Sequence, residues 1–370
     1  MASPAFHITV LGASGGPIEG MTSAYLVKPA AIPYETIITN NITDALVLVD
    51  AGCGISKMAE IIADDLQGSP NRTTESLLRL YSETLTVESY TAPTLHRTRM
   101  LQSPHLLQKD ASPIQLAFTL ADTLKNILIT HPHMDHIAAL VINSPAFGLE
   151  SGKHIYGLPE TVDALQSHVF NDQIWPNLSS QKNGTFLDFV PLESESCISI
   201  NDRFAVTPFT VSHGCVSDGS RYHSTAYLLK DIAADKRLLV FGDLEADSYC
   251  QSENNIRIWE HVSEYIIDGT LRTILIECST PNLPPRIPLY GHLTPDALFS
   301  ELSTLDEVLK GKAYAKGVKG LNVLITHVKE TMSNVDPRIT ILRELRELNE
   351  KMGLEVEITV VLPGQTYAVS

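Results

Sequence analysis

The stretch NILITHPHMDHIAAL, residues 126–140, decides how the rest of the chain is interpreted. Its first part, NILIT, is typical of a buried β-strand. Directly after it, six positions hold three histidines and one aspartate: His131, His133, Asp135 and His136. The apolar residues that follow predict a helix, with Asp135 near its first turn. Imidazole and carboxylate groups concentrated at one strand end predict a metal site.

The spacing of these residues indicates two metal ions rather than one. His131 and His133 lie two positions apart in a turn, so both can face one ion, and Asp135 and His136 can face a second ion beside it. The alternative is a histidine-rich loop that binds no metal. Four residues do not complete two sites, because zinc takes three or four protein ligands at each. Further ligands must therefore come from other strand ends.

Three later strand ends carry suitable residues. His213 ends FTVSHG, Asp243 ends LLVFGD, and His327 ends NVLITH. Taken singly, such a histidine is more often a hydrogen-bonded surface group, and Gly-Asp is more often a turn. Taken with the first cluster, all three are expected to be ligands. Asp243 has two carboxylate oxygens and is the expected bridge between the metals.

The composition is that of a globular protein with a strongly acidic surface. The 370 residues are 44% hydrophobic and 19% charged, and 43 acidic against 27 basic residues give a formal charge of −16. Such a surface repels the backbone of nucleic acids, so we expect no nucleic-acid partner. An anionic substrate would need a local source of positive charge, which a metal centre would supply.

The chain is expected to be cytoplasmic. Its five cysteines are scattered and form no CxxC pair, which suits a reducing compartment. The N-terminus has no basic segment followed by a long apolar one, so no signal peptide is expected. No stretch approaches the ~20 apolar residues of a membrane helix, so no membrane partner is expected.

The order of the expected elements predicts an α/β layered sandwich. Short apolar strands alternate with amphipathic helices, which fits two sheets with helices outside. We expect a single domain over residues 1–370. Residues 57–125 differ, because helical periodicity there is set among Ser, Pro, Thr and Gln. We interpret them as a partly helical insertion or surface excursion.

At this point the ligand pattern resembles that of the metallo-β-lactamase superfamily. THPHMDHIAALVINSP (130–145), HVFNDQIWPNL, LIECS, LYGHLTP and ITHVK are similar to motifs of the class II cyclic-nucleotide phosphodiesterases, and the chain looks close to the fungal low-affinity cAMP phosphodiesterases. The resemblance runs from ITVLGASGGP to LPGQTY and implies an αββα four-layer sandwich. Met134, where leucine is common in the motif, is a mild departure. By this resemblance one metal takes His131, His133, His213 and Asp243, and the other takes Asp135, His136, Asp243 and His327.

The resemblance also implies the chemistry. Two Zn²⁺ ions per chain are expected, since five of the seven ligands are imidazoles, which Mg²⁺ binds poorly. A hydroxide that bridges the metals attacks phosphorus and opens 3′,5′-cyclic nucleotides, with cAMP and also cGMP as expected substrates, which dampens cAMP signalling. His292 is the expected general acid for the 3′ leaving oxygen, held by Glu277, and Asp135 belongs to the same catalytic set. The alternative for His292 is a helix cap, but Thr294 suits that position better.

Asn143, Ser144, Trp175 and Tyr290 are candidates for a purine pocket, although Trp175 could equally be plain core. A homodimer is allowed by the resemblance, with residues 57–125 as a candidate contact surface. Two other functions stay open. One is a different hydrolase of the same fold, such as a nuclease, an arylsulfatase or a thioester hydrolase. The other is a catalytically inactive metal-binding nucleotide sensor.

Overall fold

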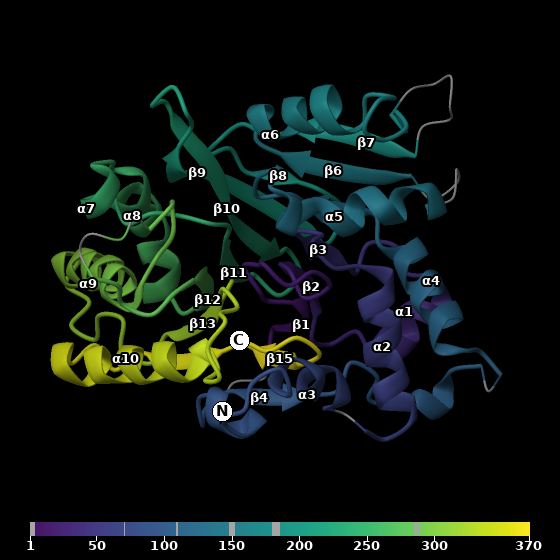
Figure 1. Ribbon diagram of the computed structural model, residues 1–370, viewed down its shortest axis with the longest axis horizontal. Coiled ribbons are helices and arrows are strands. Elements are labelled where there is room, and N and C mark those ends of the chain that lie inside the picture. Colours follow the sequence, from purple (N-terminus) through teal and green to yellow (C-terminus); the bar gives the residue numbers. More distant parts are fainter. Residues whose placement is uncertain are drawn as a thin grey trace.

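The computed structural model describes residues 4–69, 71–108, 110–147, 152–179, 186–284, 287 and 289–370. Two β-sheets lie face to face at the centre, and helices cover their outer faces (Figure 1). From one outer surface to the other the layers are therefore helix, sheet, sheet, helix. The prediction of two sheets with helices outside is confirmed.

The first sheet has the strand order β4-β15-β1-β2-β3-β5-β6-β7 within the described residues. Strands β3, β5, β6 and β7 run parallel to one another. The carboxyl ends of parallel neighbours meet at one edge of a sheet, so the residues that follow β3 and β5 come together there. The strands are β1 (Phe6–Gly12), β2 (Ala24–Pro29), β3 (Val47–Val49), β4 (His96–Thr98), β5 (Asn126–Leu128), β6 (Lys153–Gly157), β7 (Leu187–Pro191) and β15 (Thr366–Val369).

The second sheet has the order β14-β13-β12-β11-β10-β9-β8 in the same part of the chain. A long antiparallel hairpin, β9 with β10, is followed by the parallel strands β11, β12, β13 and β14. The ends of β11, β12 and β13 therefore lie at a common edge. The strands are β8 (Ile198–Ser199), β9 (Phe204–Cys215), β10 (Arg221–Asp231), β11 (Lys236–Phe241), β12 (Leu271–Glu277), β13 (Asn322–Thr326) and β14 (Glu357–Val360).

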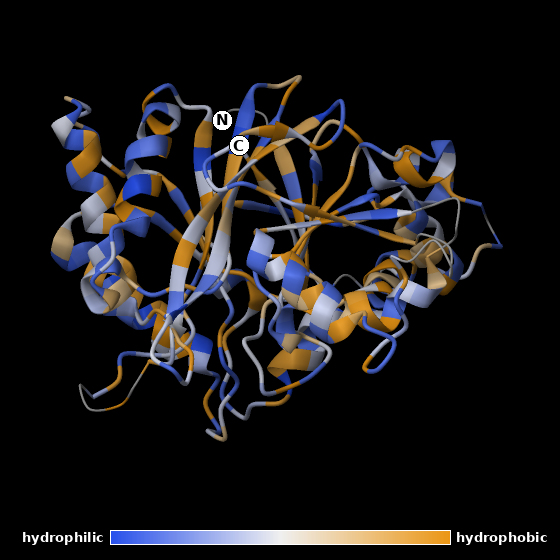
Figure 2. Ribbon diagram, turned by 90° about the horizontal axis from the view of Figure 1, so that it is seen from above, coloured by the Kyte–Doolittle hydropathy of each residue, from blue (hydrophilic) through white to orange (hydrophobic). Residues whose placement is uncertain are grey.

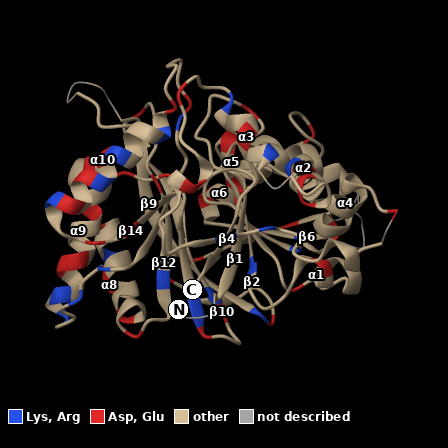
Figure 3. Cartoon of the chain, turned by 90° about the horizontal axis from the view of Figure 1, so that it is seen from below, with Lys and Arg blue, Asp and Glu red and all other residues tan. Residues whose placement is uncertain are grey.

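The helices divide between the two outer faces. Helices α1, α2, α4 and α5 bury apolar residues against the first sheet, and α8, α9 and α10 do so against the second. Helix α9 carries four acidic residues and one lysine, and α10 carries acidic and basic residues along its length, so neither helix presents a continuous basic face (Figure 3). The helices are α1 (Tyr34–Asn40), α2 (Ile55–Leu66), α3 (Arg72–Leu78), α4 (Pro113–Thr123), α5 (Met134–Asn143), α6 (Pro159–Ala164), α7 (Asp247–Cys250), α8 (Asn254–Ile267), α9 (Pro295–Gly311) and α10 (Pro337–Met352).

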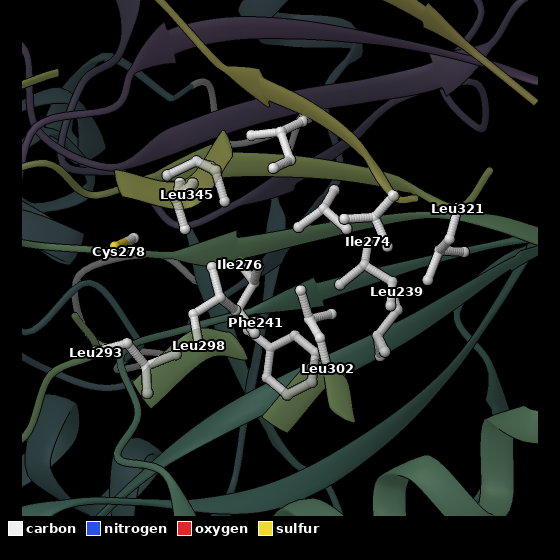
Figure 4. Close-up of a cluster of buried hydrophobic side chains, with 14 of the residues drawn as sticks. Leu239, Phe241, Ile274, Ile276, Cys278, Leu293, Leu298, Leu302, Leu321 and Leu345 are labelled. Carbon is white, nitrogen blue, oxygen red and sulfur yellow. The ribbon is translucent and has the colours of Figure 1, made fainter. Parts of the chain in front are cut away.

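Three apolar layers hold these elements together. One lies between the sheets and includes Phe6, Tyr227 and Leu275, all buried. The other two lie under the helices, and Figure 4 shows the one in which Leu298 and Leu302 of α9 pack on β11 and β12. Figure 2 shows apolar residues along the central strands and a mixture of apolar and polar residues along the outer helices. Burial on this scale dominates the stabilisation of the fold and makes the strand ends a rigid support.

Local sequence signals explain where several helices begin and end. Ser112 and Gln115 form a reciprocal capping box at the start of α4, with Pro113 at the first helical position. The side chain of Asp336 accepts a hydrogen bond from the Arg338 backbone N–H at the start of α10. That helix ends where Gly353 takes a left-handed conformation with φ 63°.

Residues 57–125 are partly helical, and the structure builds them into both outer layers. Helices α2 and α4 pack on each other and on the first sheet. Strand β4 pairs with β15 at the edge of that sheet. Leu78, Val87 and Tyr90 are buried in the core of the second sheet. The interpretation of this span as an insertion into a single 1–370 domain stays a prediction.

Helix α8 was not anticipated, although its sequence NNIRIWEHVSEYII is amphipathic. Ile258, Trp259, Val262 and Ile266 recur at helical spacing and are all buried. The strands β6 and β7 were also not anticipated. Among the described helices, none is both long enough and apolar enough to cross a bilayer.

Candidate metal centre

The loop between β5 and α5 supplies the first group of predicted ligands. Strand β5 is fully buried, and the chain leaves it at the edge where β3 also ends. Asp50 follows β3, and its Oδ1 accepts a hydrogen bond from the Thr130 backbone N–H at 2.8 Å. This bond fixes the start of the loop. His133 occupies the N-cap position of α5 with an extended backbone, so the next two ligands, Asp135 and His136, lie in the first turn of the helix.

The second sheet supplies the other predicted ligands. His213 lies near the end of β9, Asp243 follows β11 after one glycine, and His327 directly follows β13. Strands β11, β12 and β13 are parallel neighbours, so two of these residues emerge at one edge. The packing of the two sheets brings this edge against the β5–α5 loop. All seven predicted metal ligands therefore meet, although they are separated by up to about 200 positions of sequence.

Asp243 lies between the two groups of ligands. Its Oδ2 is 3.7 Å from Nε2 of both His131 and His213. Its Oδ1 is 3.4 Å from His136 Nε2 and 3.2 Å from His327 Nε2. One oxygen of the carboxylate thus faces each group. The groups whose potential ligand atoms all lie within 4.8 Å of one another are His131 with His133, His213 and Asp243; Asp135 with His136 and His327; and Asp243 with His292 and His327.

Hydrogen bonds orient four of the five histidines. His136 Nδ1 lies 2.7 Å from Asp50 Oδ2, and His213 Nδ1 donates to the Gly291 carbonyl at 2.7 Å. His131 Nδ1 is 3.1 Å from the Thr130 hydroxyl, and His327 Nδ1 is 3.0 Å from the Ser279 hydroxyl. In each of these rings Nε2 is left facing the cluster. This is the arrangement that metal-binding histidines use to fix the tautomer and the direction of the ligand atom.

The nitrogen atoms that face the cluster fit a cation. His136 Nε2 and His327 Nε2 are 3.2 Å apart, and His213 Nε2 and His133 Nδ1 are 3.3 Å apart. His131 Nε2 is buried without a hydrogen-bond partner in the described part of the chain. Neutral imidazole nitrogens that face one another repel unless a proton or a metal ion lies between them. The donor set of nitrogen and carboxylate oxygen is the one that zinc and related metals prefer.

The pKa values of the first group keep its histidines available as neutral ligands. Burial lowers the pKa of His131 well below its usual value and lowers that of His133 to about 4. Burial also lowers the pKa of His213, although Asp243 opposes it. Neutral imidazole is the form that binds a metal ion. These three residues therefore need to lose no proton before they bind.

In the second group, which is Asp135, His136 and His327, neighbouring charges outweigh burial in setting the pKa values of His136 and Asp135. Burial alone would lower the pKa of His136, but the carboxylates of Asp243 and Asp50 outweigh it and raise the pKa well above its usual value. Burial alone would raise the pKa of Asp135 and of Asp243, but the adjacent imidazoles hold both below their usual range. Without a metal, this side of the cluster attracts a proton as its cation. A metal ion would replace that proton.

His292 and Glu277 lie beside the cluster as a hydrogen-bonded pair. His292 Nδ1 is 3.0 Å from Glu277 Oε1 and 3.8 Å from Asp243 Oδ2. Glu277 ends β12, is buried, and accepts further hydrogen bonds from the Leu244 backbone N–H at 2.9 Å and the Ser279 hydroxyl at 2.6 Å. Burial alone would lower the pKa of His292, but Glu277 raises it. The N-cap of α9 is Thr294, as predicted, so His292 is not the cap.

The backbone conformation at position 291, directly before His292, requires a glycine. It has φ 86°, which side chains rarely tolerate, and a Cβ atom there would lie 2.7 Å from His213 Nδ1. Its carbonyl is the hydrogen-bond partner of that nitrogen. The glycine therefore allows one backbone segment to hold His213 and to present His292.

The four residues predicted to form a purine pocket do not lie together in the structure. Asn143 and Ser144 lie at the C-terminal end of α5, so the ten-residue helix separates them by about 13 Å from the ligands at its N-terminus. Asn143 Oδ1 accepts from the Ile55 backbone N–H, and Ser144 is fully buried. Trp175 packs on the core and donates to Ser144 Oγ at 3.2 Å. Tyr290 is 76% exposed and directly precedes Gly291, whose carbonyl holds His213.

Three residues of the site were not anticipated: Asp50, Ser279 and Tyr222. Asp50 ends the apolar run LVLVD in the same way as Asp243 ends LLVFGD, so a signal for it existed. Ser279 lies two positions after Glu277 and joins that carboxylate to His327. Tyr222 stacks on His133 with ring centroids 4.8 Å apart, and no sequence pattern pointed to it.

Sequence comparison identifies relatives over almost the whole chain. The family model of the class-II cAMP phosphodiesterases matches residues 35–364. The chain is 34% identical to 3′,5′-cyclic-nucleotide phosphodiesterase 1 of Saccharomyces cerevisiae over 98% of each chain. It is 31% identical to a 3′,5′-cyclic-nucleotide phosphodiesterase of Candida albicans, over 98% of this chain and 100% of the relative.

Structural comparison agrees with the sequence relatives. The crystal structure of unliganded yeast PDE1 superimposes with a TM-score of 0.86 at 34% identity and covers 99% of this chain and 100% of the yeast chain. The metallo-β-lactamase fold protein YhfI of Bacillus subtilis superimposes with a TM-score of 0.52 at 15% identity, over 98% of both chains. At that identity the second match shows the fold alone. The prediction of a four-layer sandwich of the metallo-β-lactamase type is confirmed.

Proposed function

The chain belongs to the class-II cAMP phosphodiesterases, and on that premise we propose that it hydrolyses 3′,5′-cyclic nucleotides to 5′-nucleotides. Cyclic AMP is the expected main substrate and cGMP a second one, and the consequence in the cell is a weaker cAMP signal. The observation that carries the proposal is the position of Asp243. Its two oxygens face two separate groups of predicted ligands, as a site for a pair of metal ions requires.

Two Zn²⁺ ions per chain are the proposed cofactors. One would be held by His131, His133, His213 and Asp243, and the other by Asp135, His136, Asp243 and His327. When bound, two such ions make a water molecule acidic enough to serve as nucleophile at neutral pH and place positive charge beside the phosphoryl oxygens. Zinc suits this donor set because five of the seven residues are imidazoles.

The proton for the leaving group comes from His292 in this proposal. Cleavage of the 3′ ester leaves an alkoxide on the ribose, which needs a proton. Glu277 accepts a hydrogen bond from His292 Nδ1, so Nε2 is the nitrogen that is free to act on the substrate. The buried Glu277 carboxylate also stabilises the charged imidazolium before transfer. Asp135, with its pKa held low, stays an anion throughout and keeps His327 oriented at 3.3 Å.

The structure offers one candidate for the base of the nucleotide. The exposed ring of Tyr290 follows directly before the Gly291–His292 segment, so a purine stacked on it would lie next to the general acid. Discrimination between cAMP and cGMP, a homodimer, a cytoplasmic location and the absence of nucleic-acid partners remain predictions.

The test uses purified full-length protein and cAMP. We expect about two equivalents of zinc per chain by elemental mass spectrometry, release of 5′-AMP, loss of turnover after chelation, and recovery when zinc is returned. A thioester, a sulfate ester and a small RNA serve as alternative substrates and should react far more slowly. Undiminished turnover in the metal-stripped protein, or none in the zinc-replete protein, would contradict the proposal.

A further inference from the structure

His133 differs from the other histidines of the cluster in how it is held. It turns Nδ1, rather than Nε2, toward His213, at 3.3 Å. Its remaining nitrogen, Nε2, forms no hydrogen bond with any described residue, and the residue is partly exposed although its ring packs inside the cluster. The other four rings each have a hydrogen-bond partner on the nitrogen that faces away from the cluster. Something other than a hydrogen bond must therefore set the direction of the His133 ring.

The ring of Tyr222 is in the position to do this. It lies parallel to the His133 ring, with an interplanar angle of 6° and centroids 4.8 Å apart. It also meets His131 and His213 edge-on, at 6.2 Å and 5.8 Å between centroids. Tyr222 thus contacts all three histidines of one predicted metal site. Because the Tyr222 ring lies against one face of the His133 ring, the His133 ring cannot rotate toward Tyr222.

A β-bulge directs Tyr222 toward the site. The register of β9 and β10 shifts between Arg221, opposite Cys215, and His223, opposite Ser212. Two residues of β9, His213 and Gly214, therefore oppose the single residue Tyr222 of β10. A bulge of this kind redirects side chains locally, and Gly214 has the positive φ of 75° that such a bulge often uses. The bulge therefore fixes the positions of two side chains: the predicted ligand His213, and Tyr222, whose ring packs on His133.

We propose that Tyr222 is the positioning residue of His133, and that its aromatic ring, not its hydroxyl, sets the affinity of one of the two metal sites. The inference rests on the metal-binding half of the proposed function. The hydroxyl of Tyr222 forms no hydrogen bond with the described residues, so it does not brace the histidine. The ring is half-buried and supplies a flat apolar surface parallel to the imidazole.

The experiment measures metal affinity in three variants of the full chain. Zn²⁺ is titrated against a chelator of known affinity, and bound metal is measured by elemental mass spectrometry for wild type, Tyr222→Phe and Tyr222→Ala. The matched control is Tyr265→Ala, which removes a half-buried tyrosine that also packs on a histidine, His261, at 6.0 Å, away from the cluster. Thermal unfolding of each variant verifies that it is folded. The values of kcat and KM for cAMP are measured alongside.

We expect Tyr222→Ala to bind one of its two zinc ions about 10- to 100-fold more weakly, as when other supports of metal ligands are removed. Tyr222→Phe and Tyr265→Ala should bind both ions as wild type does. In saturating zinc, Tyr222→Ala should recover most of its kcat. Wild-type affinity in Tyr222→Ala would overturn the inference, and so would an equal loss in Tyr222→Phe, because the hydroxyl would then be responsible. If the wild-type protein binds no zinc, the proposed cofactor is wrong. If the wild type binds two zinc ions and Tyr222→Ala binds them equally well, only the inference about Tyr222 is wrong.

Discussion

The metal cluster and the surroundings of Arg338 are both buried and highly charged, yet they differ in how their polar atoms are paired. Arg338 is fully buried and donates to Glu330 and to Asp336, the latter at 2.9 Å. The hydroxyls of Ser14 and Tyr81 donate to Glu330, and that of Tyr90 donates to Asp336. In this network, donors face acceptors, with Arg338 Nε as the exception. In the metal cluster, imidazole nitrogens face one another, and each such pair needs a proton or a metal ion between its two nitrogens.

The comparison shows that buried charge alone does not identify a functional site. The Arg338 network contains its own cation, and it joins residues 81–90 to the segment that follows His327. Apart from Arg338 Nε, its buried charges are paired within the network, which is expected of a structural element. The metal cluster has a surplus of acceptor atoms and contains no arginine or lysine among the described residues, so without a metal ion it depends on a proton held by His136 as its cation. Such a surplus indicates that a ligand is needed.

The largest effect should come from Asp243→Ala. The change removes the carboxylate that faces both groups of ligands, so both metal ions should be lost and cAMP turnover should fall below that of any other single variant. Elemental mass spectrometry and a cAMP assay measure the two effects. Asp336→Asn is the matched control from the Arg338 network and should keep its zinc. Full zinc content and activity in Asp243→Ala would contradict the assignment.

His292→Ala should come next in size. Removing the general acid should lower kcat by about 10²–10⁴-fold, because the 3′ alkoxide must then leave without a positioned proton. The zinc content should stay at the wild-type value, since His292 is not one of the seven proposed ligands. If the variant loses zinc instead, His292 is a ligand and the grouping of Asp243 with His292 and His327 describes the true site.

Arg338→Leu should reduce stability rather than chemistry. It leaves two buried carboxylates without their cation, which typically lowers the free energy of unfolding by about 3–5 kcal/mol. Urea denaturation measures this loss. The rate per folded molecule and the zinc content should not change below the unfolding transition. Loss of zinc with unchanged stability would show that the network serves the metal site instead.

The smallest effect should be a change in the acid dependence of stability in Glu330→Gln. Burial alone would raise the pKa of Glu330, but Arg338 lowers it below the usual 4.5. The folded protein therefore binds fewer protons than the unfolded chain at acidic pH. The stability from this group is fully present above pH 4.5 and is lost as the pH falls through the lowered pKa.

The measurement compares wild type and Glu330→Gln by chemical denaturation between neutral and acidic pH, with a chelator present so that metal binding does not contribute. We expect a constant difference in the free energy of unfolding down to about pH 4.5, and a smaller difference below it. A difference that grows as the pH falls would mean that the carboxylate is destabilising in the folded protein.

Much of the fold and of the site could be predicted because the signals are local. Short apolar runs and helix-capping residues depend on neighbours within one or two turns, so strands such as β5 and helices such as α10 were recognisable. Ligand-type residues at the ends of apolar runs were recognisable for the same reason. Asn143 and Ser144 show where this reasoning is weak. They lie close to the cluster in sequence, but one helix separates them from it in space.

The chain's sequence by itself determined which residues are the proposed metal ligands, since the spacing from His131 to His136 and the strand-end positions of His213, Asp243 and His327 are properties of the chain alone. The tertiary structure decided how these residues are used. Which nitrogen of each histidine faces the cluster depends on contacts between distant parts of the chain, such as His136 with Asp50 and His133 with Tyr222. Those partners are 86 and 89 positions apart. The pairing of β3 with β5 in the first sheet brings Asp50 to His136, and the packing of the two sheets, driven by burial of their apolar faces, brings Tyr222 to His133.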